Sequence, residues 1–201
     1  MKKIFLILTL VFISLNKLEA KKIKIAGYYI NLSKDTVRVI FLVPIDFFSK
    51  EPNFQAICRR IKYYDTKNQK LKLDAEKAEQ FSFKVNGQRV VMLSRNYDDR
   101  INGDRQIFLR LIKNGKLKLL RYYTTGGGYS GMGMGGGSYS IQKDMLEKAN
   151  GKLFEPSWLS FKKDMTNYLS DCPSVAKKIE EKTYRSADIE QIVEEYNKYC
   201  N

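Results

Sequence analysis

The chain has 201 residues, a formal net charge of +14 and a hydrophobic fraction of 43%. This length and hydrophobic content suit one domain with a buried core and exclude global disorder. The absence of histidine excludes Ser-His-Asp and Cys-His hydrolysis and histidine-based zinc sites, and three scattered cysteines cannot supply a four-thiolate zinc site. We therefore expect no metal site and no cofactor.

The first twenty residues have the pattern of an export signal. Two lysines precede an apolar run over residues 4–15, and Ala20 supplies a small residue for cleavage. The run is shorter than the ~20 apolar residues of a membrane-spanning helix, so we expect a cleaved signal peptide over residues 1–20 rather than an anchor. The mature chain is predicted to lie in the periplasm, the cell envelope or outside the cell.

Beyond the signal, apolar and polar residues alternate, with many β-branched and aromatic residues, and this pattern is typical of strands. Two hairpins are expected before residue 75, one over 22–32 with 36–44 and one over 59–66 with 70–74. One helical turn is expected within residues 75–80. Residues 21–156 as a whole are predicted to form an antiparallel β domain.

Two Asn-Gly pairs, Asn86-Gly87 and Asn114-Gly115, lie between alternating runs. Asn-Gly tolerates the positive φ of two-residue hairpin turns, so each pair predicts a hairpin. Residues 96–104 are polar and predict a loop. About eight strands joined by short connections predict an α+β protein whose antiparallel β-meander forms a sandwich or a half-barrel.

Eight of the thirteen glycines lie within residues 126–137. Strand patterns flank this segment, so it predicts a long hairpin tip. Its GxGxxG match does not predict dinucleotide binding, because that motif must follow a strand and open a helix in a βαβ unit. The tip offers three candidate contact residues: Tyr129, Met132 and Met134.

Residues 157–201 show apolar residues at helical spacing and predict a three-helix tail packed on the β domain. The expected apolar face of the first helix consists of Trp158, Phe161, Met165, Tyr168 and Leu169. Pro173 is expected to open the second helix, and Ser186 to act as the N-cap of the third.

The three cysteines are predicted to have different states. Cys172 begins the second tail helix and Cys200 ends the third, so an antiparallel helical hairpin would place them at the same height. We expect a disulfide between them in an oxidising compartment. Cys58 is left over, and its neighbourhood is compatible with a small buried apolar residue or with a thiol activated by Arg59 and Arg60.

The positive charge is concentrated in the β domain. Residues 1–20 carry +2 and residues 157–201 carry −1, which leaves +13 on residues 21–156. Cations that alternate with apolar residues are typical of a solvated sheet face, but Arg110, Lys118 and Arg121 are also candidate contact residues. Acidic polysaccharide, lipopolysaccharide or an envelope protein would suit such a surface, whereas export makes nucleic acid a poor partner.

Asp98, Asp99 and Asp104 form the one notable group of acids. Their spacing does not fit an EF-hand loop, and solvated loop acids are the simpler interpretation. Because glycoside hydrolysis needs only two carboxyl groups across a cleft, a glycan-acting enzyme stays an alternative.

Two stretches resemble a group of small exported proteins from Bacteroidetes-type bacteria. They are GYYINLSKDTVRVIFLVP (27–44) and LSDCPSVAKKIEEKTYRSADIEQIVEEYNKYC (169–200), the latter resembling the Asp-Cys-Pro and Tyr-Asn of the group's tail. The chain is similar to the soluble part of relatives that continue into an outer-membrane β-barrel. The resemblance implies an envelope location and no catalytic residues.

These observations favour an exported, non-catalytic binding or accessory module. The alternatives are the glycan-acting enzyme and a structural subunit of an outer-membrane assembly. Strongly salt-dependent binding of an acidic polymer would identify the basic sheet as the contact surface, because salt screens exposed charges.

Overall fold

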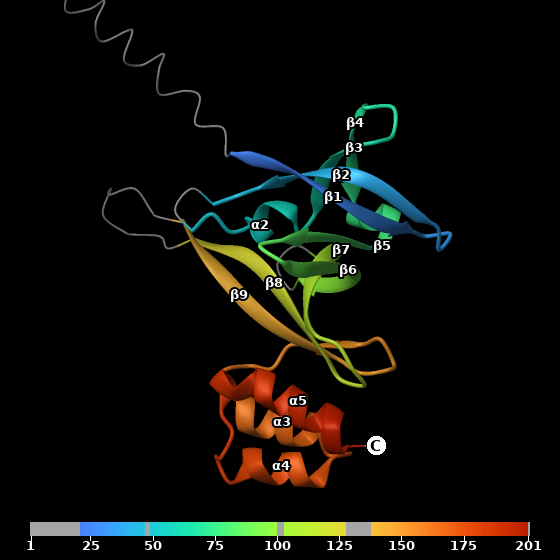
Figure 1. Cartoon of the computed structure of the whole chain (residues 1–201). Helices are drawn as coiled ribbons and strands as arrows, with labels where there is room; N and C mark the ends of the chain where they lie inside the picture. The colour runs from blue at the N-terminus through green and yellow to red at the C-terminus, as the bar shows by residue number, and fades with distance from the viewer. Residues whose placement is uncertain (1–20, 47–48, 100–102, 128–137, 201) are drawn as a thin grey trace, which may run out of the picture.

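The computed structural model describes residues 21–46, 49–99, 103–127 and 138–200 (Figure 1). The expected signal peptide and most of the glycine-rich tip, including Tyr129, Met132 and Met134, lie outside the described residues. The β domain and the helical tail occupy opposite ends of the molecule, with β1 and β2 at the end remote from the tail (Figure 1).

Ten described strands form one antiparallel sheet in the order β10-β9-β8-β7-β6-β5-β1-β2-β3-β4. Their bounds are β1 Lys22–Asn31, β2 Thr36–Pro44, β3 Arg60–Tyr64, β4 Lys70–Asp74, β5 Ala78–Val85, β6 Gln88–Asp99, β7 Gly103–Lys113, β8 Lys118–Gly127, β9 Ser138–Glu147 and β10 Leu153–Phe154. Two meanders, β1–β4 and β5–β10, are therefore joined where β5 pairs with β1. All these strands share one open sheet, so the expected two-sheet sandwich is not formed.

The expected hairpins before residue 75 are confirmed, and the helical turn that follows them is a short 3₁₀ helix, η2 (Ala75–Lys77). Asn86 and Gly87 have φ values of 50° and 78°, the positive values that a tight hairpin turn needs. The strand count differs from the expected eight, partly because β10 has only two residues and gives too short a pattern to detect.

The prediction of a polar loop over residues 96–104 is wrong. Strand β6 continues to Asp99 and β7 begins at Gly103, with Tyr97 opposite Arg105. Tyr97 is buried while its neighbours Asn96 and Asp98 are exposed, so the segment alternates as a half-buried strand does. Asn96 and Asp98 thus occupy the outer face of this strand end, whereas Arg105 lies opposite Tyr97 on the inner face and donates to the Tyr122 hydroxyl at 3.3 Å.

The main core lies inside the curved sheet, around Phe41, Phe81 and Phe108, which are fully buried. Helix α2 (Phe54–Ile57) fills the space where β8 and β9 diverge from β7 (Figure 1). Just beyond α2, the carbonyl oxygen of Cys58 accepts a hydrogen bond of 2.6 Å from the amide of Phe108, so α2 is held against β7.

The three expected tail helices are present as α3 (Phe161–Tyr168), α4 (Pro173–Glu180) and α5 (Ile189–Tyr199). They enclose a second core that also takes Leu117, Leu119 and Leu146 from the sheet. Two details differ from the expectation. Trp158 precedes α3 and is 81% exposed, and a 3₁₀ turn, η3 (Ser186–Asp188), moves the N-cap of α5 from Ser186 to Asp188.

The second Asn-Gly pair does not make the tight turn that the sequence predicts. Strand β7 ends at Lys113 and β8 begins at Lys118, so the connection has four residues. Leu117, at the end of this connection, is fully buried in the core of the tail, and a Cβ on Gly115 would collide with the side chain of Asn197. The tail therefore determines the shape of this turn.

Candidate functional site

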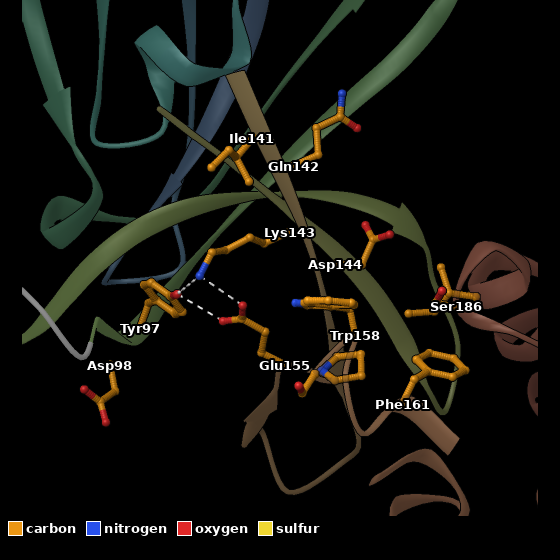
Figure 2. Close-up of a pocket in the computed structure, with 13 residues that line it drawn as sticks. Tyr97, Asp98, Ile141, Gln142, Lys143, Asp144, Glu155, Trp158, Phe161 and Ser186 are labelled. Atoms are coloured by element: carbon orange, nitrogen blue, oxygen red, sulfur yellow. Dashed lines mark hydrogen bonds and ion pairs between the residues drawn. The ribbon is translucent and has the colours of Figure 1, made fainter. Parts of the chain in front are cut away.

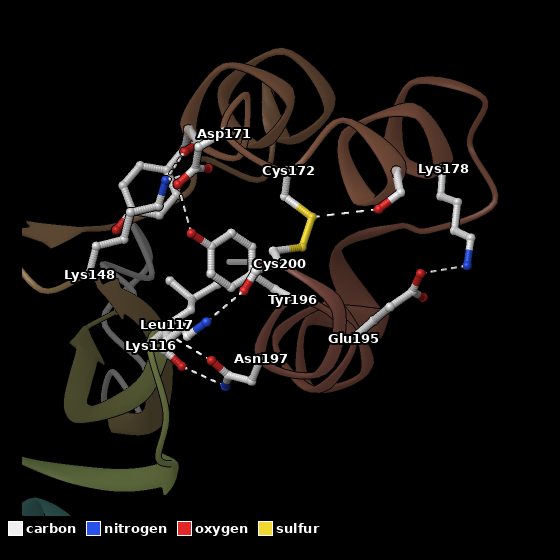
Figure 3. The surroundings of a disulfide bond; sticks show 12 residues. Lys116, Leu117, Lys148, Asp171, Cys172, Lys178, Glu195, Tyr196, Asn197 and Cys200 are labelled. Carbon is white, nitrogen blue, oxygen red and sulfur yellow. Dashed lines mark hydrogen bonds and ion pairs between the residues drawn. A yellow bond between two sulfur atoms is a disulfide. The ribbon is translucent and has the colours of Figure 1, made fainter.

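The disulfide between Cys172 and Cys200 joins the start of α4 to the end of α5 (Figure 3). The two Cα atoms are 5.5 Å apart, and both residues are buried. The pairing expected from the helical hairpin is thus present, and it closes the end of the tail that lies next to the β7–β8 connection.

The residues of the Tyr-Asn and Asp-Cys-Pro motifs anchor the tail. The side-chain amide of Asn197 donates to the carbonyl oxygen of Leu117 and its oxygen accepts from the Leu117 amide, both at 2.8 Å (Figure 3). Asp171 accepts hydrogen bonds from Tyr196 at 2.7 Å and from Lys148 at 2.8 Å. Burial opposes ionisation of Asp171, but these two donors outweigh it and lower its pKa.

The three basic residues predicted as a contact surface have partners inside the protein. Arg110 lies 4.3 Å from the ring centre of Phe54, a cation–π contact. Lys118 forms an ion pair with Glu147 at 2.5 Å. Arg121 forms ion pairs with Asp144 on β9 at 2.6 Å and with Glu190 on α5 at 3.3 Å.

These contacts change how the alternating cations of β7 and β8 are interpreted. They are half-buried instead of lying on a solvated face, and Lys113, like Arg121, reaches the tail by pairing with two glutamates of α5. The sequence pattern shows the cations but not the acids that face them, because those acids come from β9 and α5.

Glu147 is the most deeply buried of these acids, with only 2% of its side chain exposed. Its carboxylate forms ion pairs with Arg95 and with Lys118, and Arg95 donates a second hydrogen bond to it at 3.1 Å. Burial raises the pKa of a carboxyl group, but the two cations outweigh this effect and lower the pKa of Glu147. Glu147 is thus an ionised structural residue.

A different set of cations lies on the outer surface of β1–β4, which we call the basic face: Lys22, Lys24, Arg38, Lys62, Lys70 and Lys72. The register places Lys24, Leu42, Lys62 and Lys72 in one row across the four strands. The neighbouring row, which contains Phe41 and Tyr63, points into the core, so the cations share the opposite surface.

The basic face has little internal charge compensation. Within the described part of the chain, the acid of this face is Asp74, which is already paired with Arg60 and Lys77. Lys24 contacts the ring of Tyr64 at 4.9 Å. No described acid lies within ion-pair distance of any of the six cations, and Ile40 between them is 45% exposed.

A groove of about 730 Å³ lies where β9 approaches the segment that leads into α3 (Figure 2). Lys143 bonds to Glu155 at 3.0 Å and to the Tyr97 hydroxyl at 3.2 Å, and that hydroxyl donates to Glu155 at 3.1 Å. Burial is the main cause that raises the pKa of Tyr97. In Figure 2 the exposed indole of Trp158 lies between Glu155 and Phe161.

The groove brings together acids but not a catalytic pair. Asp144 is bound by Arg121 and Glu155 by Lys143, so both carboxylates are held by cations. A glycosidase acid needs a raised pKa, whereas the described carboxyl groups with displaced pKa values (Glu147, Asp171 and Glu195) all have them lowered. Asp98 lies exposed at the rim, and of Asp99 and Asp104 only the backbone is described.

Cys58 is buried, and its Sγ donates to the carbonyl oxygens of Phe54 at 3.1 Å and Tyr123 at 3.4 Å. Burial raises its pKa to about 11, which outweighs the opposing effect of Arg59. Of the two interpretations of Cys58, the buried apolar residue therefore agrees with the structure, because a thiol is nucleophilic only when ionised.

Among the described residues, no group of three acids or cysteines could hold a metal ion. In the same part of the chain, no helix is long and apolar enough to cross a membrane.

Comparisons with known proteins found no match to this chain among protein-family models, curated proteins or solved structures. The resemblance to small exported proteins therefore stays a prediction.

Proposed function

We propose that this protein is an exported, non-catalytic module of the cell envelope that binds an acidic polysaccharide through the basic face. The observation that carries the proposal is the set of six cations on the outer surface of β1–β4, with no described acid within ion-pair distance. On β7 and β8, by contrast, Lys113, Lys118 and Arg121 are matched by acids of β9 and α5, so the basic face has more uncompensated charge than those two strands.

The geometry of the basic face suits a linear polymer. Neighbouring strands lie about 4.8 Å apart, so the row of Lys24, Lys62 and Lys72 spans about 14 Å. Strand pairing fixes the positions of these lysines, two strand spacings between Lys24 and Lys62 and one between Lys62 and Lys72, and a chain of repeated carboxylate or sulfate groups can contact several of them at once. Such binding is electrostatic and should weaken as salt increases.

Two further observations support the exported location. The first twenty residues have the composition of a signal peptide. The Cys172–Cys200 disulfide is of a kind that persists in oxidising compartments and is rare in the cytosol. An exported protein meets acidic envelope polymers rather than nucleic acid, which favours polysaccharide as the partner.

The test is binding of the mature protein to immobilised alginate, an acidic polysaccharide, with uncharged dextran as the reference. We expect retention on alginate at low salt that is lost by about 0.5 M NaCl, and no retention on dextran. The double variant Lys62→Glu/Lys72→Glu should bind at least tenfold more weakly. Lys162→Glu/Lys163→Glu, on the exposed surface of α3, makes the same change in net charge and should bind nearly as well as the wild type.

Equal loss in both double variants would show that only net charge matters and would overturn the assignment to the basic face. Stronger binding to vesicles of anionic phospholipid than to alginate at the same salt would overturn polysaccharide as the partner. Circular dichroism of each variant confirms that the fold is retained.

A further inference from the structure

The edge of β9 beside the groove is open, and this carries an inference that is independent of polysaccharide binding. Strand β9 pairs with β8 along its whole length, from Ser138 to Glu147. On its other side it pairs with β10 only at Leu146 and Glu147. No other described strand pairs with residues 138–145 on that side, so alternate backbone N–H and C=O groups there have no strand partner.

The two edges of the sheet differ in how they are protected. The opposite edge, β4, has five residues and carries the exposed Lys70 and Lys72, and short length and lysines discourage pairing with another chain. The open part of β9 has uncharged residues at Ser140, Ile141 and Gln142, and its two charged residues, Lys143 and Asp144, are already paired with Glu155 and Arg121. It therefore has less protection than β4.

The groove runs along this open edge. Its wall includes four consecutive residues of β9, from Ile141 to Asp144. Successive side chains of a strand point to opposite faces, so a groove that touches all four must follow the edge of the strand rather than one face. Figure 2 shows these residues along β9, with Trp158 and Glu155 on the segment facing them.

The chemistry of the groove indicates what would fill it. Trp158, Phe161 and Ile189 supply apolar surface, while Asp98, Asp144 and Glu155 outnumber the one lysine, Lys143. With Arg121 beside Asp144 counted, the groove has three acids and two cations, and the acid in excess is the exposed Asp98, in a protein whose net charge is +14. A basic and apolar occupant complements it, and an acidic polymer does not.

We infer that the open edge of β9, with the groove beside it, binds an extended peptide segment of a partner protein in which basic and apolar side chains alternate. The peptide continues the sheet in the position that β10 leaves at Leu146. Six residues of β9, 140–145, offer about six backbone hydrogen bonds to an antiparallel strand. Apolar side chains of the peptide lie against Trp158, and basic ones lie near the exposed Asp98.

The single tryptophan of the chain makes this inference testable, because Trp158 lines the groove and is exposed. The probe is a pool of eight-residue synthetic peptides that alternate Lys or Arg with Val, Ile, Leu or Phe. We expect members that shift the Trp158 emission to shorter wavelength and slow amide exchange across residues 140–145. The same peptides with N-methyl groups on alternate residues should bind at least tenfold more weakly, because they cannot complete the ladder.

Variants separate the groove from general stickiness. Trp158→Ala and Gln142→Lys should each weaken peptide binding at least tenfold, measured by calorimetry. Leu159→Ala is the matched control, since Leu159 is 77% exposed next to Trp158 but does not line the groove, and its binding should be unchanged. All three variants should bind alginate as the wild type does, which separates this inference from the polysaccharide proposal.

Three results would overturn the inference. One is that no member of the pool binds, or that N-methylated peptides bind equally well. Another is that the protein forms a dimer in sedimentation experiments that Gln142→Lys dissolves, which would make a second copy the occupant. The third is that a neutral oligosaccharide such as cellohexaose produces the emission shift while the peptides do not.

Discussion

The disulfide gives the sharpest test of how the tail is stabilised. Replacing Cys172 and Cys200 together with alanine removes a crosslink between residues separated by 28 positions. Without the crosslink the unfolded chain has more conformational entropy, so we expect the free energy of unfolding to decrease by about 3.5 kcal/mol. Small domains have only about 5–15 kcal/mol of net stability, so the effect is large.

The measurement is urea unfolding of the mature protein followed by far-ultraviolet circular dichroism, with and without a reducing agent. The double variant should unfold at lower urea in both conditions, and the reduced wild type should match it closely. Cys58→Ala is the control for loss of a cysteine, and it should keep its sensitivity to the reducing agent. A double variant that loses less than about 1 kcal/mol would refute the assignment of the disulfide as the main crosslink of the tail.

Further expected outcomes concern single residues. Glu147→Gln leaves two half-buried cations without their carboxylate and should cost about 3 kcal/mol, whereas Glu194→Gln at an exposed pair should cost under about 1 kcal/mol in the same urea assay. Because its folded-state pKa lies below the ordinary 4.5, Glu147 stabilises the fold above that pH, and its contribution should be lost as acid unfolding proceeds below pH 4.5. Cys58 should resist a thiol reagent at pH 8 until urea unfolds the chain, and rapid labelling of the native protein would contradict its burial. Asn197→Ala removes two hydrogen bonds to Leu117 and should speed amide exchange in α5 while the exchange of β1–β4 stays unchanged.

Much of the fold can be predicted from local signals. The alternation in β1 and β2, the positive φ expected at Asn86-Gly87 and the proline that opens α4 are each determined by a few neighbouring residues. The cysteine pair is equally predictable, because its two positions bracket a helical hairpin symmetrically. These signals do not depend on what the rest of the chain does.

The features that the sequence does not predict depend on contacts between distant segments. The pairing of β5 with β1 determines the strand order, and no local pattern encodes it. Leu117 and Asn197 reshape the Asn114-Gly115 connection across 80 residues of sequence. Trp158 continues the helical spacing of α3 but stays outside the helix, because that helix begins only at Phe161.

The candidate sites likewise depend on contacts between distant segments. Arg110, Lys118 and Arg121 look like a contact surface in the sequence, but partners from α2, β9 and α5 occupy them. The basic face is not predicted from the sequence, because its lysines come from several strands and are aligned in a row only by the strand register. Alternation of lysines in residues 22–24 and 70–72 is the one signal that could have indicated it.

The most direct test of the proposed function is a lysine footprint on the alginate complex. The mature protein is labelled with an amine-reactive acetylating reagent with and without alginate, and the modified lysines are quantified by mass spectrometry. We expect alginate to protect Lys24, Lys62, Lys70 and Lys72 and to leave Lys162 and Lys163 as reactive as before. Protection centred on Lys162 and Lys163, or spread evenly over the surface, would contradict it.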